Sequence, residues 1–466
     1  MHVLPVVHRL EEKYAGKLVV IGVHAGKFIA ERETENIRTA CRRLEVGHPV
    51  VNDRQFRTWR AFGVQAWPTM VLVAPDGRYI GTHAGEFTFD QFDRIIGVAV
   101  EAFAAEGSLI EGPLTISPEP EPEIAGPLRF PGKVLADPVG GRLFVADTAH
   151  NRVLVTTPDE SGLRATVTHT IGSGEKGFRD GAFGECTLNH PHGMALQESM
   201  LFVADTENHA LRAADLVSGT VTTIAGTGEI GYSRQGGVAA ETELNSPWDV
   251  LESDNYLYIA MAGTHQIWRL YLSSGMVAPF AGSGRENIDD GPNPRATLAQ
   301  PSGLTTDEQR LFFADSESSA VRAADFSPEG YTQTLLGSGL FDFGDRDGKG
   351  VEVRLQHCLG VAYNDEAIYI ADTYNNKIKR YDLGTKEVRT VLGSGEAGEL
   401  YEPGGLSVWD GPGGPRLYVA DTNNHRVLVA PIMADGSLGP AEVVEIVFAP
   451  GGARLPKDSE FVEGGG

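Results

Sequence analysis

Six segments of the chain share a run of consecutive apolar residues, a polar turn and a second apolar run. They align without gaps as LFVADTAHNRVLV, LFVADTENHALRA, LYIAMAGTHQIWR, LFFADSESSAVRA, IYIADTYNNKIKR and LYVADTNNHRVLV, which begin at Leu143, Leu201, Leu257, Leu311, Ile368 and Leu417. An antiparallel strand with one face in water alternates apolar and polar positions, and these strands do not. Both faces of each strand are therefore expected to be covered by protein.

The spacing of these segments predicts an architecture. The alanine that ends the first apolar run recurs at intervals of 49 to 58 residues, and each repeat contains four strand-like pieces bounded by Gly, Asn and Asp. A sheet that packs between two sister sheets keeps both faces dry, as a propeller blade does. The sequence predicts a six-bladed β-propeller over residues 130–449.

An aspartate follows the first apolar run in five of the six repeats, as Asp147, Asp205, Asp315, Asp372 and Asp421, whereas the third repeat has Met261. A short carboxylate at the entry to a turn is typical of an Asx motif, in which it accepts backbone N–H groups of the turn. We expect these residues to be structural, because each lies on a different blade and has no second carboxylate nearby for calcium. Asparagines are expected in the left-handed positions of the turns, namely Asn151, Asn208, Asn375 and Asn424.

The repeats resemble NHL repeats through the ADTxNHR core and the following GxG, and this resemblance covers roughly two-thirds of the chain. Long segments join the fourth strand of one repeat to the first strand of the next, except for the short last junction, GEAGELYEP. These loops should cluster on one face of the disc. Loops on a rigid scaffold usually carry function, so we expect a protein partner or a small ligand on this loop face.

Residues 1–111 follow a different pattern, in which helix-like and strand-like stretches alternate. A first helix ends over residues 11–17, KLVVIGVHA is a predicted buried strand, residues 31–45 form a predicted helix, and HPVVND is a short strand. A helix containing Trp59 precedes two apolar strands joined by a Pro-Asp-Gly turn, and an amphipathic helix capped by Thr88 or Asp90 follows. This order predicts an α/β unit.

The sequence Ala66-Trp67-Pro68-Thr69 before the hairpin resembles the thioredoxin family. From the residues alone Pro68 is equally well an ordinary proline at a strand entry. The resemblance implies a cis bond before Pro68 and a substrate groove lined by Trp67 and Pro68. It also implies a CxxC at the start of the first helix, where the helix terminus lowers the thiol pKa, and this chain has no such pair. Cys41, on a predicted middle helix, cannot replace it, so no catalytic residue is expected.

MHVLP resembles the residues that directly follow CxxC in proteins that join a thioredoxin-like domain to NHL repeats. Two explanations remain open: the start codon is misassigned, which we favour, or the domain has lost its active site. Loss of a strand and of part of a helix would leave apolar surface uncovered, at a cost of several kcal/mol. The fold class is thus multidomain, a truncated thioredoxin-like α/β domain (1–111), a Pro/Glu linker (112–129), the all-β propeller (130–449) and a tail (450–466).

Charge restricts the partners of the chain. The formal net charge is −24, and residues 112–466 carry 26 basic and 49 acidic residues, whereas residues 1–111 carry 13 and 14. So acidic a surface repels nucleic acids and anionic membranes. The start lacks the pattern of a signal peptide and no stretch is long enough to span a bilayer, so we expect a cytoplasmic protein, most simply a monomer.

Metal and thiol chemistry are weakly indicated. Cys41, Cys186 and Cys358 are widely separated and show no CxxC spacing, which predicts structural thiols rather than disulfides or a zinc site. His190 and His192 stand at a blade entrance and other histidines lie at the turns, as His150, His209, His265 and His425. A channel metal would need histidines from several blades at matching inward positions, so we expect neither a metal nor a cofactor.

Three functions remain to be tested. The chain as given is expected to be a non-catalytic scaffold whose propeller loops bind a protein or a small ligand. The alternative is a thiol–disulfide oxidoreductase whose CxxC lies upstream of a misassigned start and whose propeller recruits the substrate. A metal-dependent propeller lyase is the weaker alternative, because it requires the channel metal.

Overall fold

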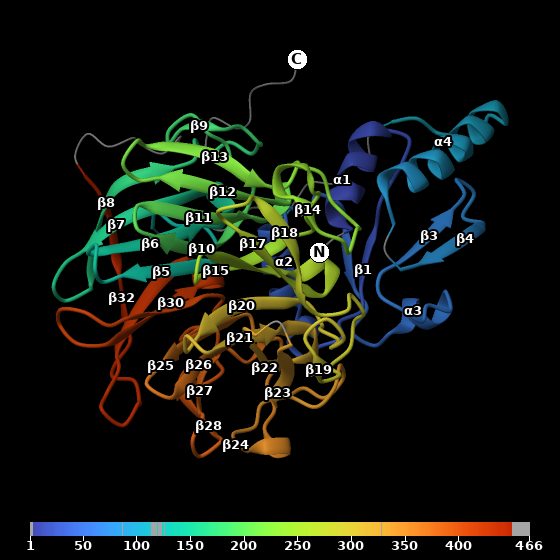
Figure 1. The fold of residues 1–466 in the computed structure, drawn as a ribbon. Coiled ribbons are helices and arrows are strands. Elements are labelled where there is room, and N and C mark those ends of the chain that lie inside the picture. The colour runs from blue at the N-terminus through green and yellow to red at the C-terminus, as the bar shows by residue number, and fades with distance from the viewer. Residues whose placement is uncertain are drawn as a thin grey trace. The chain divides into compact units, whose positions relative to one another are not determined.

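The computed structural model describes residues 3–85, 87–112, 119, 124, 126–327 and 329–449. The chain divides into two compact units, residues 1–123 and 124–466, which are described separately (Figure 1). Most of the predicted linker (112–129) and all of the predicted tail (450–466) lie outside the described residues.

The second unit contains six antiparallel meanders, numbered here as blades 1 to 6 (Figure 1). Blade 1 comprises β5 (Lys133–Asp137), β6 (Arg142–Asp147), β7 (Arg152–Pro158) and β8 (Arg164–Ile171). Blade 2 comprises β10 (Pro191–Gln197), β11 (Met200–Asp205), β12 (Ala210–Asp215) and β13 (Thr220–Ala225). Blade 3 comprises β15 (Pro247–Ser253), β16 (Tyr256–Met261), β17 (Gln266–Tyr271) and β18 (Met276–Ala281).

The remaining three blades repeat this order of strands. Blade 4 comprises β20 (Pro301–Thr306), β21 (Arg310–Asp315), β22 (Ala320–Asp325) and β23 (Tyr331–Leu336). Blade 5 comprises β25 (Gly360–Asn364), β26 (Ala367–Asp372), β27 (Lys377–Asp382) and β28 (Glu387–Leu392). Blade 6 comprises β29 (Leu406–Trp409), β30 (Arg416–Asp421), β31 (Arg426–Pro431) and β32 (Glu442–Val443).

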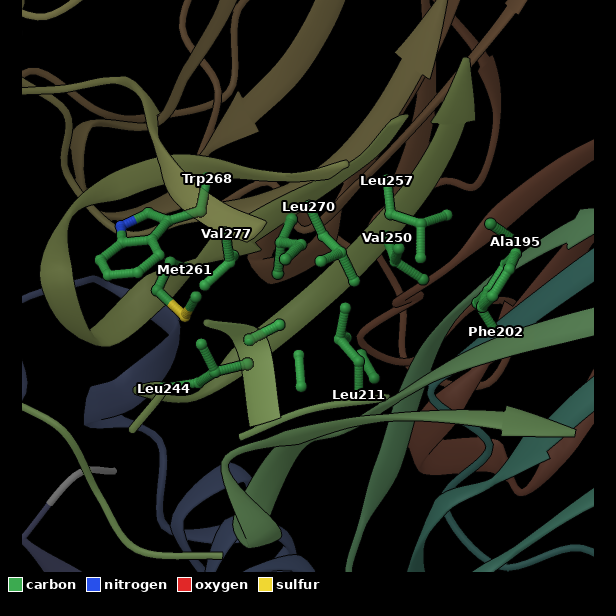
Figure 2. Close-up of a cluster of buried hydrophobic side chains, with 14 of the residues drawn as sticks. Ala195, Phe202, Leu211, Leu244, Val250, Leu257, Met261, Trp268, Leu270 and Val277 are labelled. Carbon is green, nitrogen blue, oxygen red and sulfur yellow. The ribbon is translucent and has the colours of Figure 1, made fainter. Parts of the chain in front are cut away.

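The first strands of the blades form a closed ring. β5 contacts β10, and the contacts continue through β15, β20, β25 and β29 back to β5. Six separate clusters of buried apolar side chains fill the spaces between neighbouring blades, one for each pair. Figure 2 shows the cluster between blades 2 and 3, with Phe202 and Ala195 at one end and Trp268 and Met261 at the other. The prediction of a six-bladed propeller is confirmed, and the apolar strands have both faces covered.

Five of the six blades have a fifth strand beyond the predicted four, whereas blade 6 has four. Each long loop between blades contributes a two-residue strand that pairs with the outer strand of the blade it leads into. These strands are β9 (Gly181–Ala182), β14 (Gly237–Val238), β19 (Gly291–Pro292) and β24 (Gly348–Lys349). In blade 1 the fifth position is taken by β33 (Glu445–Phe448), which runs parallel to β8 and closes the ring with residues from the other end of the propeller. The loops are therefore held to the rims of the sheets along part of their length.

A 3-10 turn joins the second and third strands of every blade. These turns are η2 (Thr148–His150), η3 (Thr206–Asn208), η5 (Ala262–Thr264), η6 (Ser316–Ser318), η8 (Thr373–Asn375) and η9 (Thr422–Asn424). The residue after each turn is left-handed, and only Asn151 of the four predicted asparagines occupies this position. The first glycine of the GxG that ends the fourth strand also has positive φ, and a Cβ on Gly226 would lie 2.4 Å from the carbonyl oxygen of His209. The first glycine of GxG is thus required, because the fourth strand passes too close to the turn for any side chain.

The described residues of the first unit form four α-helices and two short sheets. The helices are α1 (Leu4–Lys13), α2 (Thr34–Arg43), α3 (Arg57–Ala61) and α4 (Phe89–Ala105), and η1 (Ala30–Arg32) precedes α2. β1 (Gly22–His24) pairs in parallel with β2 (Val50–Asn52), and β3 (Thr69–Val73) forms a hairpin with β4 (Tyr79–Ala84). The remaining 3-10 turns, η4 (Ala239–Glu241) and η7 (Gly350–Glu352), belong to the propeller loops.

The alternation of helices and strands predicted for residues 1–111 is present, with differences in length. Of the predicted strand KLVVIGVHA only three residues pair with β2, and the helix predicted over 31–45 is divided into η1 and α2. α1 and α4 pack together through Val6, Leu10, Phe92 and Ile96. Thr88 caps α4 in a capping box with Gln91 at N3, as one of the two predicted caps. The Trp67–Pro68 peptide bond is cis.

Candidate functional site

The repeated aspartates are fully buried, and they do not form the predicted Asx contacts with their own turns. One carboxylate oxygen instead accepts a backbone N–H from the segment that leads into the first strand, at 2.7 Å in each case. The donor is the residue directly before a left-handed residue of that segment. These pairs are Arg129 with Asp147, Asn189 with Asp205, Ala299 with Asp315, Gln356 with Asp372, and Tyr401 with Asp421. The carboxylate therefore joins the second strand to the segment that enters the first strand of the same blade.

The second carboxylate oxygen contacts a cation on the third strand. In blade 2, Asp205 Oδ2 lies 2.7 Å from Arg212 Nη1, and neither side chain is exposed. The other pairs are Arg152–Asp147, Arg322–Asp315, Lys379–Asp372 and Arg426–Asp421. The cation stands five positions after the aspartate in blades 1 and 6 and seven positions after it in blades 2, 4 and 5. Both positions lie on the same side of the third strand, so the pairing is preserved.

The long loops add a second carboxylate in blades 2, 4 and 5. Asp180 Oδ1 lies 2.8 Å from Arg212 Nη2 and also accepts the Thr223 hydroxyl, which ties the loop to the third and fourth strands. Asp290 and Asp347 make the matching contacts in their blades. These three aspartates were not among the predicted residues, although an Asp-Gly pair whose glycine begins β9, β19 and β24 marks them in the sequence.

Burial opposes the ionised form of the repeated aspartates. It raises the pKa of Asp205 to about 6, against the effect of Arg212, and raises the pKa of Asp372 to about 6, against the effect of Lys379. All the contacts of Asp205 come from donors, namely Asn189 N–H, Asn208 Nδ2 and Arg212 Nη1, so the geometry is that of a carboxylate. The cost of removing the charge from water is offset by these bonds.

Blade 3 replaces the buried ion pair with apolar and neutral groups. Met261 stands at the aspartate position, its Sδ accepting Asn245 N–H at 3.3 Å, and Trp268 stands seven positions later, where Arg212 stands in blade 2. Trp268 Nε1 donates to Gln266 Oε1, so its polar atom is satisfied. The loop leading into this blade has Gly236-Gly237 in place of the Asp-Gly pair. The blade therefore lacks both the cation, which Trp268 replaces, and the loop carboxylate that would pair with it.

A second set of contacts joins neighbouring blades. The side chain of the left-handed residue after each 3-10 turn accepts a backbone N–H from the segment that leads into the first strand of the next blade. The acceptors and donors are Asn151 and His190, His209 and Ser246, His265 and Gln300, Ser319 and His357, Asn376 and Glu402, and His425 and Phe130. The His425–Phe130 bond, 3.0 Å long, joins blade 6 to blade 1. The turn histidines thus have a structural role, as expected from their place in the motif.

The acceptor role of these histidines predicts a pH dependence. Burial lowers the pKa of His209 to about 4, below the 6.5 of an exposed histidine. The unfolded chain therefore binds a proton between pH 6.5 and 4 that the folded chain does not, so stability falls as pH falls through this window. We expect His209→Asn to reduce the loss of unfolding free energy between pH 7 and pH 5 by about 2 kcal/mol.

Asparagine is the natural acceptor at this position in blades 1 and 5, so His209→Asn keeps the bond and removes the proton. The measurement is urea unfolding of wild type and variant at both pH values. The buried aspartates titrate in the same range, but their contribution to the pH dependence is the same in both proteins and cancels in the comparison. His169→Asn, at an exposed histidine on β8, is the control and should leave the pH dependence unchanged. An equal pH dependence in His209→Asn and wild type would contradict the assignment.

A buried ion pair joins two first strands of the ring. Lys133 on β5 of blade 1 and Asp249 on β15 of blade 3 are both buried and lie 2.6 Å apart (Nζ to Oδ2). The same strand position is glycine in the other four blades, as Gly193, Gly303, Gly360 and Gly405. A Cβ on Gly193 would lie 2.3 Å from Asp249 Cα, so only glycine allows this close approach.

The histidines considered for a channel metal lie elsewhere. His190 precedes β10 and bonds Asn189 through Nδ1, while His192 stacks on Trp248 with ring centroids 4.3 Å apart. Among the described residues, no group of three or more His, Cys, Asp or Glu side chains could hold a metal ion. The inward positions of the ring carry Lys133, Asp249 and glycines, so the geometry gives no support to a channel-metal lyase.

The long loops and the 3-10 turns lie on the same face of the propeller, because side chains of the turns bond the loops. Asn208 Nδ2 donates to Gly177 O, Asn375 Nδ2 to Gly344 O, and Asn424 Nδ2 to Ala397 O. We call this the loop face, formed by residues 172–190, 226–246, 282–300, 337–357 and 393–402 with the turns.

Aromatic side chains are exposed on three of these loops. Phe178 is 40% exposed, Tyr232 47% and Phe341 72%. The Arg212 guanidinium carbon lies 5.1 Å from the centre of the Phe178 ring, which connects this ring to the buried network of blade 2. The loop face therefore presents large apolar groups on segments whose backbones are bonded to the blades.

The predicted groove residues of the first unit belong to an aromatic group at the surface. Trp67 is exposed, its Nε1 donates to Ala25 O at 2.7 Å, and its ring lies 4.5 Å from that of Trp59. Pro68 is half-buried and its carbonyl accepts Gly85 N–H. Cys41 is half-buried on α2, and burial raises the pKa of its thiol, as it does for the buried Cys186 and Cys358. None of the three thiols has the lowered pKa of an attacking group.

The fold and its loop face define a six-bladed β-propeller protein. No family model matches the chain. It is 42% identical over 456 residues to Protein SUPPRESSOR OF QUENCHING 1, chloroplastic, of Arabidopsis thaliana, which covers 92% of this chain and 42% of that protein. It is 38% identical over 473 residues to NHL repeat-containing protein 2 of Bos taurus and of Homo sapiens, covering 92% of this chain and 64% of theirs.

The chain therefore has NHL repeat-containing homologues that match nearly its whole length, and it spans less than two thirds of their own. The superposition on a solved streptogramin B lyase structure includes 68% of this chain and 84% of the lyase chain, with 10% sequence identity and a TM-score of 0.42. This similarity is too distant to inform function. Within the described residues no helix is long and apolar enough to cross a membrane. Because one relative is named as chloroplastic, the expected cytoplasmic location stays a prediction.

Proposed function

We propose that the chain is a binding scaffold whose loop face holds a protein partner. The observation that carries this proposal is the exposure of Phe178, Tyr232 and Phe341 on loops that are pinned to the blades. Aromatic side chains contribute most per residue at protein interfaces, and loops that are already ordered lose little entropy on binding. A propeller is commonly a platform of this kind.

The interior of the ring favours a partner on the face over a small ligand in the channel. Lys133 and Asp249 form a buried ion pair between first strands, and the backbones of Gly193 and Gly405 approach these two residues closely. A protein partner can instead spread across several loops, with Phe341 and Tyr232 as apolar anchors. The acidic balance of residues 112–466 further favours a partner that is not itself strongly acidic.

The proposal is tested with a triple variant of the loop face, Phe178→Ser/Tyr232→Ser/Phe341→Ser. The full chain is used as bait in cell extract, and the captured proteins are quantified by mass spectrometry. The matched control is Val217→Ser/Met276→Ser/Tyr331→Ser, which alters three exposed apolar residues on the opposite face, where the third strands turn into the fourth. We expect a partner that wild type and control retain and that the loop-face variant loses by about tenfold or more. Equal capture by all three would contradict the proposal.

We also infer that residues 1–111 form a thioredoxin-like unit without catalytic activity. The order of helices and strands and the position of Trp67 and Pro68 before the β3–β4 hairpin support this inference. Trp67 and Pro68 would then line a groove for a polypeptide. Since burial raises the pKa of all three thiols, we expect no reduction of insulin by the chain with dithiothreitol above the buffer rate. Reduction of insulin that Cys41→Ser abolishes would contradict this inference.

A further inference from the structure

An apolar groove lies in the first unit between α4 and the β3–β4 hairpin. Its volume is about 680 Å³, and Leu72, Ile80, Ile95 and Val98 line it. Ile80 is 45% exposed, Ile95 48% and Val98 64%. Exposed aliphatic side chains gathered in one groove are typical of an interaction site rather than of scattered surface residues.

α4 has two apolar sides, and only one belongs to the core of the unit. Phe92 and Ile96 are buried against α1, whereas Ile95 and Val98 point into the groove. The groove side continues through Ala99 and Ala102, so apolar residues recur at the spacing of one helical face. A helix that needed only one partner would carry polar residues on this second side.

Charge complementarity identifies the occupant. The charged residues lining the groove are Arg78 and Arg94, in a chain with a net charge of −24. Arg78 has only a solvent-exposed contact with Asp76, at 3.4 Å, and Arg94 has no ion-pair partner among the described residues. An apolar surface with an arginine on the hairpin and another on the helix favours an apolar segment flanked by carboxylates.

We propose that this groove docks an acidic amphipathic helix of another protein. Ala99 and Ala102 keep the middle of the groove low between Ile95 and Phe103, which lets a second helix approach closely. Residues 94–103 extend for about 14 Å along α4, enough for apolar residues at positions i, i+3 or i+4 and i+7 of a partner helix. Glutamates beside these anchors would meet Arg78 and Arg94. This groove belongs to the first unit and the loop face to the second, and its role does not depend on that proposal.

The test uses the full chain and two synthetic fluorescein-labelled peptides of about 14 residues, with leucines at one helical spacing. One peptide has glutamates beside the leucines and the other has lysines. We expect fluorescence anisotropy to show at least tenfold tighter binding of the acidic peptide. Val98→Glu, at an exposed position, should weaken that binding tenfold or more, and Arg78→Glu/Arg94→Glu should reverse the preference between the peptides.

Val139→Glu, on the exposed turn between β5 and β6, is the matched control and should bind like wild type. Thermal melting of each variant checks that the fold is retained. Equal binding of both peptides, or binding unaffected by Val98→Glu, would overturn the proposal. A concentration-dependent dimer that Val98→Glu abolishes would also overturn it, because a second copy of the chain would then occupy the groove. An acidic peptide that prolines keep extended should bind more weakly than the helical one, and equal binding of the two would overturn the proposal as well.

Discussion

Replacing Asp205 with alanine is expected to lower the free energy of unfolding of the propeller by about 3 to 4 kcal/mol. The change leaves Asn189 N–H without its acceptor, removes the contact with Asn208, and leaves the buried Arg212 with Asp180 as its remaining carboxylate. Breaking a buried pair costs more than the pair contributes, because the remaining charge stays out of water.

Urea unfolding, followed by the circular dichroism of the β-sheets, measures the effect as a lower midpoint. Glu185→Ala, at an exposed position of the same blade interface, removes the same charge and should change stability by less than about 0.5 kcal/mol. Asp205→Asn keeps an oxygen for Asn189 N–H and should fall between the two. If Asp205→Ala were as stable as Glu185→Ala, the network would not hold the blade together.

Met261→Asp should destabilise the propeller by about 3 kcal/mol, although it restores the residue that the other five blades share. The position is fully buried, and Gln266 and Trp268 stand at the two positions where the other blades provide a cation. A carboxylate there would have Asn245 N–H as a donor and no cation at either of these positions. A repair based on the repeat consensus would therefore fail for an electrostatic reason.

A double-mutant cycle with Trp268→Arg separates this explanation from a simple loss of packing. The two substitutions together should be more stable than the sum of their separate effects by about 2 kcal/mol, because each supplies the partner that the other lacks. Met276→Asp, at an exposed methionine of the same blade, is the control and should have little effect. A coupling near zero would mean that Met261 is required for its shape and not for the absence of charge.

The fold of the propeller could be predicted because its physical requirement is local. Four apolar residues in a row, as in Leu417–Ala420, need protein on both faces, and six such strands at blade spacing satisfy this need in a ring. The candidate site was predicted in part. The loops were expected on one face, but their pairing as β9, β14, β19 and β24 depends on the outer strands of other repeats, which no local pattern shows.

The sequence by itself determined the number of blades, the strands that must be dry on both sides, and the positions of the repeated aspartates. Only the tertiary structure decided what those aspartates do. Arg212 and Asp180 lie 32 residues apart, and His425 and Phe130 lie 295 apart, so folding brings the members of each contact together. A buried charge or N–H must find a partner, and the partner's identity is fixed by which strands become neighbours in space.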